Sequence, residues 1–148
     1  MQEHTVDVIY TSCLKRTQET AQLSFPDRQV QPIADFDERG FGQWEGLTAD
    51  EIEAAFPEVW QAWLEAPFEV TPPEAEVFAD FQTRVWAATD RLLDSADESM
   101  ALVAHLGVLR LIYQHLVDGE AVFWNIDVPQ GRVLLLEEQD QTWKATLL

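Results

Sequence analysis

Residues 7–21, DVIYTSCLKRTQETA, decide the fold of this chain. Their first half is rich in β-branched and aromatic residues, and we predict a strand over residues 6–12. A polar turn follows, and then a predicted helix over residues 14–23. Arg16 falls in the first turn of this helix, where free backbone N–H groups and the helix dipole attract anions. The stretch therefore predicts a phosphate pocket at a strand–helix junction.

The size and composition of the chain predict one globular domain, residues 1–148. Of its 148 residues, 47% are apolar, including six Trp and eight Phe, which is enough for a packed core. We expect no secretory leader, because no basic region followed by an apolar run occurs near residue 1, and no apolar run is long enough to span a bilayer. Its single cysteine, Cys13, suits a reducing compartment. We expect a cytoplasmic protein.

The chain is strongly acidic, with 27 acidic residues against nine basic ones and a formal net charge of −18. Such a field repels nucleic acid and anionic membranes, so neither is an expected partner. It also repels an anionic substrate at long range. A phosphate site in this chain has to be positive locally.

The remaining pattern alternates strands with helices. Further strands are predicted at residues 29–33, 101–104, 132–137 and 142–147, and helices at 58–65, 74–93 and 107–116. Thr48 and Glu51 have the spacing of a capping box, which predicts a helix running toward Phe56. This order predicts an α/β fold, a three-layer α/β/α sandwich with a mostly parallel sheet.

Three residues are candidates for chemistry, and each also has an ordinary structural interpretation. Arg16 is either a solvated helix residue paired with Glu19 or Asp27, or a fork that binds phosphate oxygens. His105 follows the apolar run 101–104. It is either a core histidine bonded to a backbone carbonyl or a ligand-binding group at the end of a buried strand.

Glu38 is the third candidate, and its neighbourhood is unusual for a surface glutamate. It lies in the segment 36–46, FDERGFGQWEG, among aromatic residues and glycines. Apolar surroundings raise the pKa of a carboxyl group, which would let it act as a general acid. Asp37 and Glu45 are the rival acids in this segment.

Taken together, four segments resemble the histidine phosphatase superfamily, whose fold is called phosphoglycerate mutase-like. They are residues 7–21, residues 36–46, PEAEV at 73–77 and LVAHLGVLR at 102–110. The resemblance implies that Arg16 and His105 bind the transferring phosphoryl group, with Leu106 at the pocket floor. It also implies that Glu38 donates a proton to the leaving oxygen, and it leaves the role of Glu76 open. No metal or organic cofactor is implied.

The family's first strand ends in Arg-His-Gly, whose histidine attacks phosphorus, and this motif does not occur in the sequence. His4 stands in Glu3-His4-Thr5, ahead of the predicted strand 6–12, and lacks both companions. The resemblance implies that the chain is truncated at its N-terminus relative to the family and lacks the family's first strand and helix. A late start codon, a truncated relative, or a homodimer that joins strands would each account for this.

Three functions follow from these observations. The first is a phosphoric monoester hydrolase for small phosphorylated metabolites, inactive unless the N-terminal segment is supplied. Trp44-Glu45 and Phe123-Trp124 favour the small bacterial phosphatases, such as α-ribazole phosphatases, over the glycolytic mutases. The second is an inactive relative that binds a phosphorylated ligand or a protein partner. The third, much weaker, is a phosphatase that uses Cys13 as its nucleophile.

Overall fold

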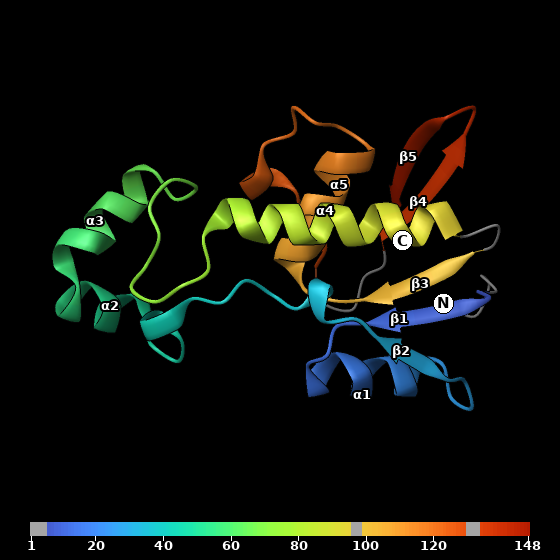
Figure 1. The fold of residues 1–148 in the computed structure, drawn as a ribbon, viewed down its shortest axis with the longest axis horizontal. Helices are drawn as coiled ribbons and strands as arrows, with labels where there is room; N and C mark the ends of the chain where they lie inside the picture. The colour runs from blue at the N-terminus through green and yellow to red at the C-terminus, as the bar shows by residue number, and fades with distance from the viewer. Residues whose placement is uncertain (1–5, 96–98, 130–133) are drawn as a thin grey trace. The chain divides into compact units, whose positions relative to one another are not determined.

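The structure is a computed structural model that describes residues 6–95, 99–129 and 134–148. The chain divides into two compact units (Figure 1). Unit 1 consists of Met1–Glu38 and Val85–Leu148, and unit 2 is Arg39–Arg84.

A parallel sheet forms the centre of unit 1. Its strands are β1 (Val8–Thr11), β2 (Val30–Pro32) and β3 (Met100–Val103), in the order β2-β1-β3. Ile9 pairs with Val30 on one side and with Ala101 on the other, and its side chain is fully buried. The parallel strands predicted from the apolar runs are therefore confirmed. Within the described residues, β3 pairs with β1 only.

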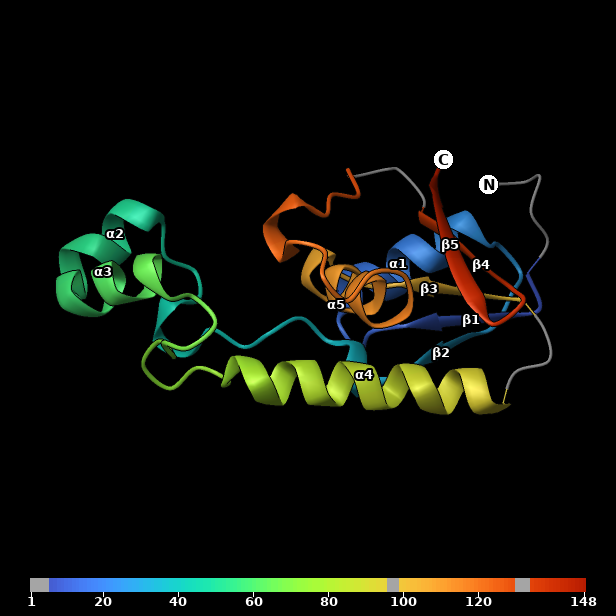
Figure 2. The same ribbon diagram turned by 90° about the horizontal axis from the view of Figure 1, so that it is seen from above.

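Helices cover both faces of this sheet. Helix α1 (Lys15–Ser24) lies on one face, and α5 (Leu106–Leu116) and the part of α4 (Phe78–Ser95) that belongs to unit 1 lie on the other (Figures 1 and 2). Trp86 on α4 donates a hydrogen bond from Nε1 to the carbonyl of Leu111 on α5, at 2.9 Å. The predicted three-layer α/β/α arrangement is confirmed. The buried apolar core of unit 1 comprises Ile9, Ala21, Phe36, Val85, Ala88, Val108, Leu111, Ile112 and Phe123.

The last two strands form a sheet of their own. Strands β4 (Leu134–Gln139) and β5 (Thr142–Leu147) pair antiparallel, from Leu134 opposite Leu147 to Gln139 opposite Thr142. Asp140 and Gln141 both have positive φ, the backbone of a type I′ hairpin turn, which pairs neighbouring strands locally. The strands predicted at residues 132–137 and 142–147 are confirmed over the described residues, where they pair with each other and not with the parallel sheet. Positions 132–133 of the first predicted strand lie outside the described residues.

Unit 2 contains α2 (Ala49–Ala55), α3 (Pro57–Glu65) and the first residues of α4. The predicted capping box is confirmed, because the Glu51 amide donates to Thr48 Oγ1 at 3.2 Å and Glu51 Oε1 accepts from the Thr48 amide at 3.1 Å. Trp44 is 5% exposed, and its ring contacts those of Trp60 and Trp63 edge-on. The buried apolar residues of the unit include Trp44, Ile52 and Phe81.

Helix α4 begins four residues later than the sequence pattern predicts. The prediction was residues 74–93, whereas the helix runs from Phe78 to Ser95. Glu74 has a φ of 61°, which lies in the left-handed region, and the Ala75 amide bonds to the Pro72 carbonyl in a turn. A left-handed residue cannot continue a right-handed helix, so the apolar period extended the prediction too far.

Candidate functional site

Two strand–helix junctions meet at one edge of the sheet in unit 1. Strands β1 and β3 run in parallel and pair at their last residues, Thr11 opposite Val103. Helix α1 follows β1 with Leu14 at its N-cap, and α5 follows β3 with His105 at its N-cap. Helix N-termini at the carboxyl edge of a parallel sheet are a common setting for anion binding.

Arg16 and His105 come from these two junctions and contact each other. Arg16 Nη2 lies 3.4 Å from His105 Nδ1. Arg16 is an exposed residue, whereas His105 is buried, with 8% of its surface exposed. The ordinary structural interpretation paired Arg16 with Glu19 or Asp27, and His105 with a backbone carbonyl. Glu19 pairs with Lys15, Nζ to Oε1 at 3.7 Å, and the other ring nitrogen of His105 bonds to a hydroxyl group rather than a backbone carbonyl.

That hydroxyl belongs to Ser12, which the sequence did not single out. Ser12 is fully buried, and its Oγ lies 2.9 Å from His105 Nε2 and 2.6 Å from Thr17 Oγ1. Thr17, 4% exposed, donates from Oγ1 to the carbonyl of Leu14 at 2.8 Å. Ser12 and His105 are 93 positions apart, so their contact forms only in the folded chain and no local sequence pattern predicts it.

Two acids of the segment after β2 reach the same junctions. Asp37 Oδ1 accepts a hydrogen bond from the Cys13 amide at 2.6 Å, beside the start of α1. Glu38 Oε2 accepts from the Gly107 amide at 3.3 Å, in the first turn of α5. A Cβ atom at Gly107 would lie 2.5 Å from Glu38 Oε1, so the absence of a side chain there admits the carboxylate.

The structure thus brings together all four predicted site residues, Arg16, Glu38, His105 and Leu106. Leu106 is the first residue of α5, between His105 and Gly107. The sequence analysis missed Ser12 and Thr17, and it weighed Asp37 only as a rival acid. The structure shows it bonded to the turn that precedes α1.

His105 is held in its neutral form more strongly than a solvated histidine. Burial is the largest cause that lowers its pKa below the ordinary 6.5, and the charge of Arg16 lowers it further. The charges of Glu38 and Asp37 act in the opposite direction. The site therefore combines a permanent cation with an imidazole whose protonation is favoured by added negative charge nearby.

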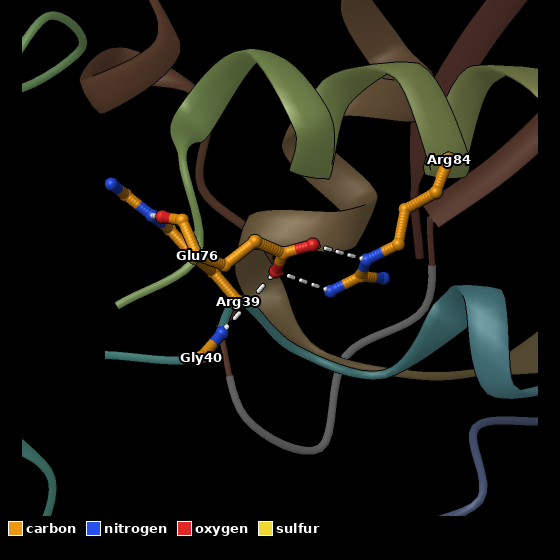
Figure 3. Close-up of polar contacts among 4 residues, drawn as sticks. All are labelled: Arg39, Gly40, Glu76 and Arg84. Atoms are coloured by element: carbon orange, nitrogen blue, oxygen red, sulfur yellow. Dashed lines mark hydrogen bonds and ion pairs between the residues drawn. The ribbon is translucent and has the colours of Figure 1, made fainter. Parts of the chain in front are cut away.

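Unit 2 holds a separate polar cluster, centred on Glu76 (Figure 3). Its carboxylate accepts two hydrogen bonds from Arg84, at 2.7 and 2.9 Å, and one from the Gly40 amide at 3.4 Å, while its backbone carbonyl accepts from Arg39 Nε at 3.0 Å. Burial alone would raise the pKa of Glu76, but Arg84, Gly40 and Arg39 together lower it below its ordinary value. Glu76, whose role the sequence left open, holds three segments of unit 2 together.

Neither a metal-binding cluster nor a membrane-spanning helix occurs in the part of the chain that the structure describes. Residues 6–95, 99–129 and 134–148 contain no group of three or more His, Cys, Asp and Glu side chains placed to hold a metal ion. No helix in those ranges has the length and apolar character needed to cross a membrane.

Comparisons with known proteins give matches over the whole chain. A family model described as histidine phosphatase superfamily (branch 1) matches residues 1–148. The adenosylcobalamin/α-ribazole phosphatase of Escherichia coli (strain K12) is 33% identical over 129 residues, 84% of this chain and 64% of the relative. Phosphoserine phosphatase 1 of Hydrogenobacter thermophilus is 28% identical over 93% of this chain and 67% of the relative. The match thus spans less than two thirds of the E. coli relative.

Solved structures resemble the chain as well. The α-ribazole phosphatase of Shigella flexneri superposes with a TM-score of 0.90 at 27% identity, over 100% of this chain and 75% of that one. A phosphoglycerate mutase from Bacillus anthracis has a TM-score of 0.78 at 19% identity, over 99% of this chain and 74% of that one, a likeness of fold alone.

Proposed function

Because this chain belongs to the histidine phosphatase superfamily, we propose that it binds the phosphoryl group of small phosphorylated metabolites at the edge of its parallel sheet. One observation carries the proposal. Arg16 and His105, from neighbouring strand–helix junctions, approach to 3.4 Å at two helix N-termini. A guanidinium fork, an imidazole and free backbone N–H groups make up a donor set suited to phosphate oxygens.

Each site residue has a role in this proposal. Arg16 donates to two phosphoryl oxygens, and His105 donates to one when it carries a second proton. The backbone N–H of Leu106, at the start of α5, adds a donor aligned with the helix dipole. Glu38 delivers a proton to the oxygen of the departing alcohol.

Turnover requires a nucleophile in addition to these groups. In the phosphohistidine route, a histidine nitrogen bonds to phosphorus, the bond from phosphorus to the ester oxygen breaks, and Glu38 protonates that oxygen. Water then cleaves the phosphorus–nitrogen bond and releases phosphate. The 148 residues contain no Arg-His-Gly motif. We propose that such a histidine, where supplied, makes the protein a phosphomonoesterase.

The second candidate function is binding without catalysis, which needs only groups that the structure describes. An arginine and a histidine can hold a phosphorylated ligand without splitting it. The named relatives are an adenosylcobalamin/α-ribazole phosphatase and a phosphoserine phosphatase. We propose small phosphomonoesters of these kinds as the first ligands to test in either case.

One experiment separates the two functions. Hydrolysis of p-nitrophenyl phosphate is measured together with the rise in melting temperature caused by orthophosphate. A phosphatase shows turnover that is lost in His105→Ala and strongly reduced in Glu38→Gln. A binding protein shows the melting-temperature rise without turnover. If neither signal appears, the proposal is refuted.

Two control variants complete the experiment. Lys15→Ala removes a positive charge next to Arg16, from a side chain that is 89% exposed. We expect it to keep most of the response to orthophosphate. Cys13→Ser tests the cysteine mechanism, because any turnover that depends on the thiol is lost in this variant.

A further inference from the structure

A chain of hydrogen bonds leads from His105 into the interior of unit 1. His105 Nε2 lies 2.9 Å from Ser12 Oγ, Ser12 Oγ lies 2.6 Å from Thr17 Oγ1, and Thr17 Oγ1 donates to the Leu14 carbonyl at 2.8 Å. Ser12, Thr17 and His105 are all buried. The proposed function uses only the opposite side of the imidazole, so these hydroxyl groups have no part in it.

The direction of every bond in this chain follows from its two ends. At one end, a guanidinium has only donors, so His105 Nδ1 must accept from Arg16. At the other end, the Leu14 carbonyl has only lone pairs, so Thr17 must donate to it. The neutral imidazole therefore carries its proton on Nε2 and donates a hydrogen bond to Ser12 Oγ, and the Ser12 hydroxyl group donates a hydrogen bond to Thr17 Oγ1. If the bonds ran in the opposite direction, His105 would carry its proton on Nδ1, and this N–H would face an N–H of Arg16, so that two donors would meet.

We propose that Ser12 and Thr17 are positioning residues that fix the Nε2–H tautomer of His105, so that anion binding at Arg16 is accompanied by uptake of one proton at Nδ1. This inference rests on the proposed function. Nε2 keeps its bond to Ser12 throughout. The lone pair of Nδ1 takes a proton from solvent, and the new N–H donates to an oxygen of the anion.

The charges around the imidazole fit such proton uptake. Arg16 on α1 faces it with a positive charge, and Asp37 and Glu38 face it with negative charges. When no anion is bound, burial and the charge of Arg16 favour the neutral imidazole of His105. An anion bound to Arg16 offsets that positive charge and adds negative charge beside Nδ1, which favours the imidazolium. The bound ligand thus changes the sum of the charges around His105.

The tautomer is measured without any ligand, by ¹⁵N NMR of the histidine rings. We expect the wild-type His105 to show the Nε2–H pattern. His115, whose Nε2 lies 2.8 Å from Asp90 Oδ1 near the end of α5, serves as the reference in the same spectrum. In Ser12→Ala the ratio of the two His105 tautomers should shift about two- to tenfold, the equivalent of one net hydrogen bond, while His115 stays unchanged.

Thr17 supplies a matched pair of variants. Thr17→Val keeps the shape and removes the hydroxyl group, and it should shift the tautomer ratio in the same direction as Ser12→Ala. Thr17→Ser keeps the hydroxyl group and should restore the wild-type ratio. If the substituted proteins fail to fold, the wild-type spectrum alone decides. A predominant Nδ1–H tautomer of His105 overturns the inference.

Proton uptake is tested with inorganic sulfate, whose charge does not change across the neutral range. The dissociation constant of sulfate should fall as the pH decreases from 8 to 6, by up to about tenfold per pH unit where one proton is taken up. His115→Gln should keep this dependence, and Thr17→Val should weaken it. Sulfate binding that is independent of pH overturns the inference and leaves the proposed function intact. If neither sulfate nor orthophosphate binds, the proposed function itself fails.

Discussion

Replacing Gly107 by alanine should displace the proposed acid, Glu38, without unfolding the protein. The new Cβ would lie 2.5 Å from Glu38 Oε1, and an ordinary contact begins at 3.4 Å, so that oxygen has to move by about 0.9 Å. The atom that moves is the end of a flexible side chain, which makes the displacement cheap in energy. The 3.3 Å hydrogen bond from the Gly107 amide to Glu38 Oε2 is lost with it.

The opposing terms in the free energy of unfolding nearly cancel for Gly107→Ala. Alanine in a helix is more favourable than glycine by about 0.5–1 kcal/mol. The lost hydrogen bond is long, and its net contribution is about 0.5–1.5 kcal/mol. We therefore expect the free energy of unfolding to change by less than about 1 kcal/mol.

The chemistry of the site should change far more than its stability. A general acid displaced by this distance loses its alignment with the leaving oxygen, so any turnover of p-nitrophenyl phosphate should fall by about 100-fold. The pKa of His105 reports the same displacement independently of turnover. The Glu38 charge raises the pKa of His105, so moving the carboxylate away should lower that pKa. An NMR titration of His105 measures this change.

Gly119→Ala is the matched control for Gly107→Ala. A Cβ atom at Gly119 would lie 3.7 Å from the carbonyl oxygen of Gln114, an ordinary contact. This variant should leave the His105 pKa and any turnover unchanged. If Gly107→Ala likewise leaves both unchanged, then Glu38 does not depend on the missing side chain, and our account of its position is wrong.

Three further predictions concern unit 2. Gly42 and Gly46 both have positive φ, so an alanine at either position strains the backbone, and Gly46→Ala should lower the free energy of unfolding by about 1–2 kcal/mol. Gly42→Ala should lower it clearly more in urea unfolding, because only a Cβ at Gly42 would collide with backbone, 2.3 Å from the Pro73 carbonyl oxygen. Thr48→Ala should lower the free energy of unfolding by about 1 kcal/mol through the lost cap, and a smaller loss than from Thr48→Gly would contradict this. Because the folded pKa of Glu76 is lowered, its charge stabilises the unit above about pH 4.5, and this stability is lost as the pH falls through the folded pKa. Glu76→Gln should therefore destabilise the protein by about 1–3 kcal/mol at pH 7 and flatten the acid limb of its stability profile, whereas an unchanged limb would show that Arg84 and Glu76 contribute little.

Much of the fold was predictable because its signals are local. The run from Val8 to Thr11 and the apolar residues before His105 are short, β-branched or aliphatic segments that end in polar turns. The capping box at Thr48 is a four-residue signal with one geometry. Arg16 and His105 were found because each follows a predicted strand, and Glu38 because it lies in a segment of aromatic residues and glycines.

Other features depend on contacts that no local pattern encodes. The buried bond from Ser12 to His105 joins residues 93 positions apart, and a serine in a turn gives no sign of it. The late start of α4 depends on the left-handed backbone of Glu74, which the helical period of its neighbours concealed. The separate sheet of β4 and β5 follows from a hairpin turn at Asp140 and Gln141, two residues that are uncommon at positive φ.

The central claim is that Arg16 binds a phosphoryl group, and calorimetric titration of the protein with orthophosphate tests it most directly. We predict a single site whose affinity falls about 10- to 150-fold in Arg16→Ala, the equivalent of about 1.5–3 kcal/mol for hydrogen bonds from a charged donor. Lys15→Ala, which removes the same charge one residue earlier, should stay within a few-fold of the wild type. Equal losses in the two variants would show that orthophosphate responds to charge at the start of α1 rather than to a site built around Arg16.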